Sequence, residues 1–353
     1  MFLRVISKTF AYLRQSRLFQ ILLPTVIGLT VVLWLLWDDF DPTAFRSLKF
    51  TWKSAVCLFI GLLFMVGRDI GYMWRIRILS DNQLKWKQSF RVIMLWEFTS
   101  AVTPSAIGGT SVAVVYVTKE GLSVGHSSAI VMATSLLDEL YFVTMFPLLL
   151  ILVGSDALFS VTSVQLAHNL LLLTIIGYAI KLSWVLLLSY GMFINPHGLS
   201  RLIRKIFTLP LLRRWKEGAD KAGRDIIKSA VMLRRKNFKF WLKAACATFI
   251  SWTSRYWVVN MLLLSFFVVD EHMLIFARQL IMFLAQLIAP TPGASGIAEW
   301  LFRGFLSNFI PIAGLTMAFA LLWRLITYYP YLFIGVLVFP KWLVDKFGKK
   351  KAS

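Results

Sequence analysis

The sequence predicts an all-α integral membrane protein, with about six full transmembrane helices plus two broken re-entrant helical hairpins in an inverted repeat. Three observations predict this fold. The 353-residue chain is 58% hydrophobic and only 16% charged, whereas soluble domains are about half apolar and a quarter charged. The apolar residues gather in runs of about 20, the length that crosses a bilayer. Two of these runs are broken near their middles by Thr-Pro and a following Gly, and Pro and Gly both interrupt helices.

The elements can be justified in order along the chain. A basic N-terminal segment precedes the first run, and no small-residue cleavage site follows it. We therefore expect a transmembrane helix there and not a cleaved signal peptide. The six predicted spans are residues 18–37, 53–73, 127–153, 164–193, 241–269 and 313–340. The two broken stretches are 90–118 and 273–309. No long polar block stands beside them, so we expect a single membrane domain over 1–353, with repeat halves of about 1–155 and 160–345.

Charge determines the predicted topology. The net charge is +21, and the basic residues lie between the apolar runs. The positive-inside rule and contact with anionic lipid explain this distribution better than binding of nucleic acid does. If 90–118 crossed the membrane, the very basic loop 194–240 would lie outside. The broken stretch 90–118 is therefore expected to enter and leave from the cytoplasm. The basic C-terminal segment requires 273–309 to enter and leave from outside. The prediction is a multi-pass protein of the inner (cytoplasmic) cell membrane with both termini cytoplasmic.

The basic loop 194–240 itself leaves two interpretations open. Its Leu, Trp and Ile recur at helical spacing among Lys and Arg, which favours an amphipathic helix on the cytoplasmic lipid surface. The alternative is a solvated basic connector. The two cysteines, Cys57 and Cys246, both lie in apolar segments, so they indicate neither a disulfide framework nor a metal site.

The two breaks match each other at an offset of 188 residues. The shared positions are Thr103/Thr291, Pro104/Pro292, Ala106/Ala294 and Gly108/Gly296. Inverted repeats with broken helices and a binding site near the midplane are typical of transporters.

The predicted hairpin tips are candidates for substrate binding. After each Thr-Pro, glycine permits a tight turn and a second half-helix begins, whose free N–H groups favour an anion. The candidate residues are Thr103, Pro104, Gly108, Gly109, Thr291, Pro292, Gly293, Gly296 and Glu299. Two such tips meeting from opposite faces would hold one anionic group, such as a lipid phosphate. The alternative is a packing break that binds no ligand.

Charged residues inside the predicted spans form a second set of candidates, because each is costly in a bilayer. They are Arg68, Asp69, Glu97, Asp138, Glu139, Lys181, Arg255, Arg278, Glu299, Arg303 and Arg324. One interpretation is structural pairing, for example of Arg68 or Arg324 with Asp138 or Glu139. The other is a polar interior that contacts a headgroup, with Arg68, Arg255, Arg278 or Arg324 assisting. The histidines are scattered without metal-ligand spacing, and neither a P-loop nor a nucleophile motif is present. We expect no enzyme activity, no metal and no cofactor.

At these residues the chain resembles the flippase-like transmembrane domain family of lysylphosphatidylglycerol synthases, over nearly its whole length. "TPSAIGG" matches the family's first turn, and Asp138 fits a later Asp. "APTPGASGIAE" matches the second turn through Gly293, Gly296 and Glu299, and "WRLITYY" supplies Arg324 and Tyr328. The first motif departs from the family, because Thr110-Ser111 stands where Glu is frequent.

The resemblance implies lipid translocation. In the full-length synthases a soluble aminoacyl-transfer domain follows the membrane part, whereas this chain ends at Ser353. We therefore expect a stand-alone form without lysyl transfer. The leading hypothesis is a translocase for an anionic or aminoacylated lipid or a polyprenyl-phosphate, with membrane lipids as partners and no nucleic acid. The alternatives are a non-transporting accessory protein for envelope lipid or glycan synthesis, and an intramembrane transferase, for which no catalytic cluster is present.

Overall fold

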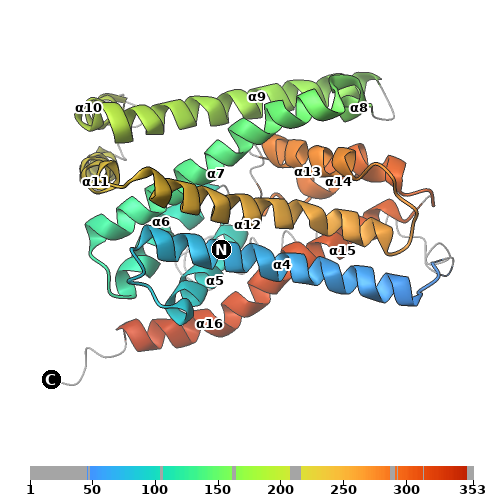
Figure 1. Ribbon diagram of the computed structural model, residues 1–353, viewed down its shortest axis with the longest axis horizontal. Coiled ribbons are helices and arrows are strands. Elements are labelled where there is room, and N and C mark those ends of the chain that lie inside the picture. Colours follow the sequence, from blue (N-terminus) through green and yellow to red (C-terminus); the bar gives the residue numbers. More distant parts are fainter. Residues whose placement is uncertain are drawn as a thin grey trace, which may run out of the picture.

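The computed structural model describes residues 46, 48–103, 106–160, 164–206, 216–286, 291, 293–312 and 314–347, and the regular structure in these ranges is entirely helical (Figure 1). The predicted span at 18–37 lies outside the described residues. So do Pro104 and Pro292, the prolines of the two predicted tips.

Two long antiparallel helices run through the middle of the molecule (Figure 1). They are α4 (Trp52–Leu79) and α12 (Phe238–Leu264), which pack against each other along their length. Ser54 Oγ, at the start of α4, donates a 2.6 Å hydrogen bond to the carbonyl of Ser265, just after α12. We call the end of the molecule where α4 ends and α12 begins the basic end, because the flanking segments carry Lys85, Lys87, Arg235, Lys236 and Lys239.

Small residues bring α4 and α12 close together. Gly67 and Gly71 are one helical turn apart on α4, and a Cβ at Gly71 would overlap Ser251 Oγ and lie 3.0 Å from the Ala247 carbonyl. Such small-xxx-small pairs let helix backbones approach closely in membranes, where lipid supplies no hydrophobic driving force for association.

The first broken stretch forms a helical hairpin at the basic end. Its arms are α5 (Trp86–Val102) and α6 (Ala106–Lys119). Arg91 near the start of α5 pairs with Glu120 just after α6, at 2.6 Å. The hairpin therefore leaves and returns at the basic end.

The second broken stretch forms a hairpin at the opposite end (Figure 1). Its arms are α13 (His272–Gln286) and α14 (Ile297–Leu306). Arg278 of α13 donates from Nη1 to the Phe305 carbonyl near the end of α14, at 2.8 Å. Because α13 follows the end of α12 that lies away from the basic end, the two hairpins extend toward each other from opposite ends of the molecule.

The remaining helices surround this centre. They are α7 (Val124–Val153), α8 (Ser155–Phe159), α9 (Val164–Ser189) with a π-helical turn (Tyr190–Ile194), α10 (Pro196–Ile206), α11 (Lys216–Arg234), a 3₁₀ turn (Ser307–Phe309), α15 (Thr316–Thr327) and α16 (Tyr329–Phe347). The predicted span 313–340 is thus two helices joined at Tyr328. In the described part of the basic segment 194–240, α10 and α11 pack together beside the basic end (Figure 1).

Among the described residues, four helical segments are long and apolar enough to cross a membrane: Trp52–Leu79, Val124–Val153, His168–Ile194 and Thr316–Lys346. The predicted span 241–269 corresponds to α12, which has the length but is more polar, since Ser251, Arg255 and Asn260 lie between its ends. Its central position between other helices explains how this polarity is accommodated.

Candidate functional site

A cavity of about 340 Å³ lies where the two hairpins meet. The first hairpin contributes Thr103 and Thr110 to its wall, and the second contributes Gln286, Thr291 and Gly293. Its charged lining residues are Arg68, Arg75, Glu97, Asp138, Glu139, Lys181, Arg255 and Arg324. Ionisable groups inside a membrane domain normally pair with one another or mark a substrate path, so each of these requires a partner or a role.

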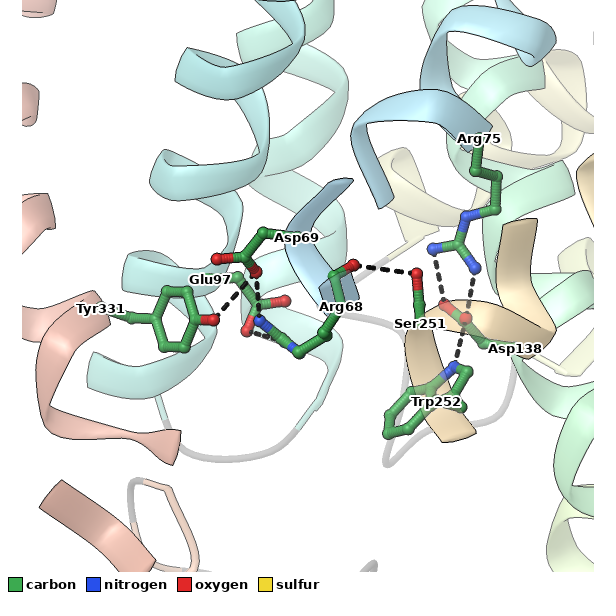
Figure 2. A network of polar contacts seen from close by, with 8 residues as sticks. All are labelled: Arg68, Asp69, Arg75, Glu97, Asp138, Ser251, Trp252 and Tyr331. Carbon is green, nitrogen blue, oxygen red and sulfur yellow. Dashed lines mark hydrogen bonds and ion pairs between the residues drawn. The ribbon is translucent and has the colours of Figure 1, made fainter. Parts of the chain in front are cut away.

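Arg68 is the centre of one polar network. Its side chain is 1% exposed, and it pairs with Asp69 at 2.8 Å and with Glu97 at 2.5 Å (Figure 2). The Tyr331 hydroxyl donates to Asp69 at 2.8 Å. The guanidinium also lies over the rings of Tyr72 and Tyr331, 4.7 and 4.8 Å from their centroids. These contacts compensate for the removal of the Arg68 charge from water.

Arg75 forms the second network and corrects a prediction. The predicted span 53–73 ends before it, but α4 continues to Leu79, so that Arg75 is buried in this helix and binds both carboxylate oxygens of Asp138, at 2.5 and 3.2 Å (Figure 2). Trp252 Nε1 donates to the same carboxylate at 2.6 Å. Arg75 follows Arg68 by seven residues, two helical turns, which puts both on one face. That spacing is the signal by which the sequence could have indicated Arg75.

Lys181 of α9 pairs with Glu139 of α7 at 2.6 Å. Its ammonium lies 4.6 Å from the centroid of the Phe142 ring. The suggested pairing of Arg68 or Arg324 with Asp138 or Glu139 is therefore wrong, because each of these acids has another cation as its partner.

Glu299 completes the start of α14. Its Oε2 accepts the Gly296 N–H at 2.6 Å, and its Oε1 accepts Arg324 Nε at 2.9 Å. The positive end of this half-helix was predicted to receive an anion. The chain's own carboxylate already occupies that position, so a ligand at this tip would meet Arg324 and not the Gly296 N–H.

The second tip has the glycine turn that the sequence predicts. Gly293 and Gly296 have φ of 56° and 86°, and Ala294 between them has 54°. A Cβ on Gly293 would overlap the ring of Tyr328. The Tyr328 hydroxyl donates to the Ala101 carbonyl of the first hairpin at 2.9 Å, so Tyr328 connects the two tips.

The first tip differs from its prediction. Gly108 and Gly109 lie inside α6 rather than in a turn, and neither has positive φ. Gly109 instead permits contact between the arms, because a Cβ there would overlap Ser100 of α5. Only Thr103 of the predicted residues of this tip lines the cavity within the described part of the chain.

Arg278 lies apart from the other predicted residues. Its guanidinium donates to the carbonyls of Phe305, Ala157 and Ser160 at 2.7–2.8 Å. Phe305 and Ala157 lie in the last turns of α14 and α8, and Ser160 directly follows α8. Backbone carbonyls at helix C-termini have no intrahelical partner. Arg278 is not part of the cavity wall, and its place indicates a structural role.

Arg255 differs from the other cations of the cavity. Among the described residues it has no carboxylate within ion-pair distance, and its guanidinium lies 5.7 Å from the centroid of the Trp252 ring. Arg324 also has an unused donor, because its buried Nη2 has no hydrogen-bond partner among the described residues. These two groups could donate to an anionic ligand without breaking an existing contact.

These features define a class: a multi-pass, all-helical integral membrane protein with a charged internal cavity. The family described as lysylphosphatidylglycerol synthase TM region matches residues 21–335. The chain therefore belongs to this family, as the motifs predict. It is also similar to a UPF0104 membrane protein of Archaeoglobus fulgidus, with 27% identity over 305 residues that cover 82% of this chain and 89% of that protein. No solved structure gives a significant match.

Proposed function

We propose that this protein translocates a lipid between the leaflets of the cytoplasmic membrane, with the headgroup in the cavity and the acyl chains in the bilayer. The observation that carries the proposal is a charged cavity, bounded by both hairpin tips, in which Arg255 has no acidic partner among the described residues. A headgroup phosphate is the anion such a group would bind in a lipid environment. The substrates we expect are an anionic or aminoacylated lipid or a polyprenyl-phosphate.

The proposed membrane arrangement has six full spans and two re-entrant hairpins related as an inverted repeat. The pair Arg91–Glu120 at the basic end and the contact of Arg278 with Phe305 at the other end support opposed hairpins. By the positive-inside rule, the basic end faces the cytoplasm, together with both termini.

Arg255 is the proposed phosphate contact, and Arg324 Nη2 is the second donor. Glu299 acts as a positioning residue, because it holds Arg324 through a 2.9 Å ion pair. Translocation neither forms nor breaks a covalent bond, so in this proposal the protein is a transporter and not an enzyme.

Reconstitution tests the proposal directly. Proteoliposomes would carry phospholipids labelled with a fluorophore on the acyl chain, and dithionite would quench the label in the outer leaflet. We expect quenching of the inner-leaflet pool far faster than in empty liposomes. Arg255→Gln should slow it about tenfold or more, the effect of losing one charge-assisted hydrogen bond. Arg235→Gln, at an exposed position of the basic end, is the matched control and should leave the rate unchanged. Rates equal to those of empty liposomes across phosphatidylglycerol, phosphatidylethanolamine and a polyprenyl phosphate would refute translocation.

An accessory role in envelope lipid or glycan synthesis is the second candidate. The observation that favours it is the pairing of every other cation in the cavity wall with a carboxylate, which is also what a purely structural interior requires. It predicts that Arg255→Gln is functionally silent in a folded protein.

A further inference from the structure

The charges in and directly behind the cavity wall are balanced overall but separated in space. Three cations pair one-to-one with carboxylates: Arg75 with Asp138, Lys181 with Glu139, and Arg324 with Glu299. Two groups depart from this pattern. Arg68 has two carboxylates, Asp69 and Glu97, and so forms a group with one excess negative charge, which we call the acidic subsite. Arg255 has no carboxylate partner among the described residues and contributes one excess positive charge.

The acidic subsite has acceptor capacity that its own contacts do not use. Glu97 lines the cavity, its side chain is 24% exposed, and it binds Arg68 through Oε2 alone. Its Oε1 has no partner among the described residues. Tyr331, which also lines the cavity, holds Asp69 through Oδ1. A ligand in the cavity can therefore reach a carboxylate oxygen without displacing Arg68.

The two excess charges come from different helices. Glu97 comes from α5, and Tyr331 from α16, whereas Trp252 and Arg255 come from α12. In Figure 2, Glu97 and Tyr331 lie on one side of Arg68, and Asp138 and Trp252 lie on the other. Arg255 is beside Trp252, so the positive group lies by α12, whereas Glu97 of the acidic subsite belongs to α5, and both residues line the cavity.

We propose that the cavity recognises a zwitterionic headgroup of zero net charge, in which a phosphate diester contacts Arg255 and a primary ammonium contacts Glu97 in the acidic subsite. This inference rests on the proposed function and narrows its substrates from the anionic lipids, aminoacylated lipids and polyprenyl-phosphates expected there to headgroups that carry a phosphate and an ammonium together. A ligand with an anion alone would leave the acidic subsite uncompensated, and a cation alone would leave Arg255 uncompensated, in a medium where unpaired charge is costly. A primary ammonium has three donors, enough to bind Glu97 Oε1 and a neighbouring oxygen together.

Retention of lipid by the purified full chain tests this subsite without requiring transport. The protein in detergent micelles would be equilibrated with equal amounts of dioleoyl phosphatidylethanolamine, phosphatidylcholine and phosphatidylglycerol, and bound lipid would be counted by native mass spectrometry. We expect phosphatidylethanolamine to exceed phosphatidylglycerol about tenfold, the scale of one charge-assisted hydrogen bond. It should also exceed phosphatidylcholine, whose quaternary ammonium has no N–H donor.

Variants assign the preference to the subsite. Glu97→Gln should abolish or invert the preference for phosphatidylethanolamine over phosphatidylglycerol. If Glu97→Gln does not fold, Asp69→Asn, which also removes one carboxylate of the acidic subsite, is the second variant. Glu120→Gln is the matched control. It also removes an ion-paired carboxylate, which Arg91 and Lys346 hold, but Glu120 does not line the cavity, so the ratio should stay unchanged.

Each result separates this inference from the proposed function. Equal retention of the three lipids by the wild type, or a ratio that Glu97→Gln leaves unchanged, would overturn the acidic subsite even if reconstituted protein moves lipid. A wild type that retains phosphatidylethanolamine in a Glu97-dependent way supports the subsite even if no lipid crosses the membrane, in which case the translocase is the part refuted.

Discussion

Removing the Glu299 carboxylate should destabilise the protein through the charge that it leaves behind on Arg324. The two side chains are 3% and 6% exposed, and Arg324 Nε lies 2.9 Å from Glu299 Oε1. In Glu299→Gln, the amide oxygen can still accept the Gly296 N–H, so the start of α14 keeps its cap while the negative charge is lost. Breaking a buried pair from one side costs about 3–5 kcal/mol. Because the cap remains, we expect about 3 kcal/mol, more than a hundredfold in the folding equilibrium.

The measurement is the free energy of unfolding in mixed micelles as SDS is increased, followed by tryptophan fluorescence. Arg324→Met together with Glu299→Gln should recover part of the loss, because no charge is then buried alone, and the interaction energy from the double-mutant cycle should be about 0.5–3 kcal/mol. Glu271→Gln, at an exposed position before α13, is the control and should change stability by less than about 0.5 kcal/mol. A loss below about 1 kcal/mol in a folded Glu299→Gln protein would refute the reasoning that this carboxylate compensates for Arg324.

Three further predictions concern packing and topology. Gly293→Ala should cost at least about 2 kcal/mol in the same unfolding assay, because it adds left-handed strain at φ 56° and an overlap with the Tyr328 ring; a neutral effect would contradict the tight turn. Gly71→Ala should cost about 1–3 kcal/mol by forcing α12 away from α4, and unchanged stability would contradict their close contact. In a variant without the two native cysteines, Asp81→Cys should react with an impermeant maleimide only from the cytoplasm and Asp270→Cys only from outside; labelling of both from one side would exclude the proposed topology.

Much of the architecture could be predicted because a membrane constrains it strongly. Long apolar runs have few alternatives to helices, since backbone groups in hydrocarbon must be satisfied internally. The Thr-Pro breaks at Thr103 and Thr291 marked the two hairpin tips, and the structure brings both threonines to one cavity. The inverted repeat and the count of six spans stay predictions, because the described residues omit 18–37.

The interior of the site was predicted less well, because composition and spacing do not determine which charges meet. Arg75 was missed, although its distance of two turns from Arg68 was visible, because a run of basic residues after a span is usually a loop. Gly108 and Gly109 matched a turn motif, yet they lie in α6, where Gly109 packs against Ser100. A glycine in a motif does not by itself distinguish a positive φ from a close helix contact.

The sequence by itself determined that this chain is a helical membrane protein and that its ends differ in charge. Both follow from local quantities, namely the cost of burying polar groups in lipid and the positions of Lys and Arg along the chain. Only the tertiary structure decided that Glu299 occupies the start of α14, that Arg68 has two carboxylates, and that Arg255 has none among the described residues. Those outcomes depend on the approach of helices that lie far apart in the sequence, and a difference of one helical turn in their packing would pair other charges.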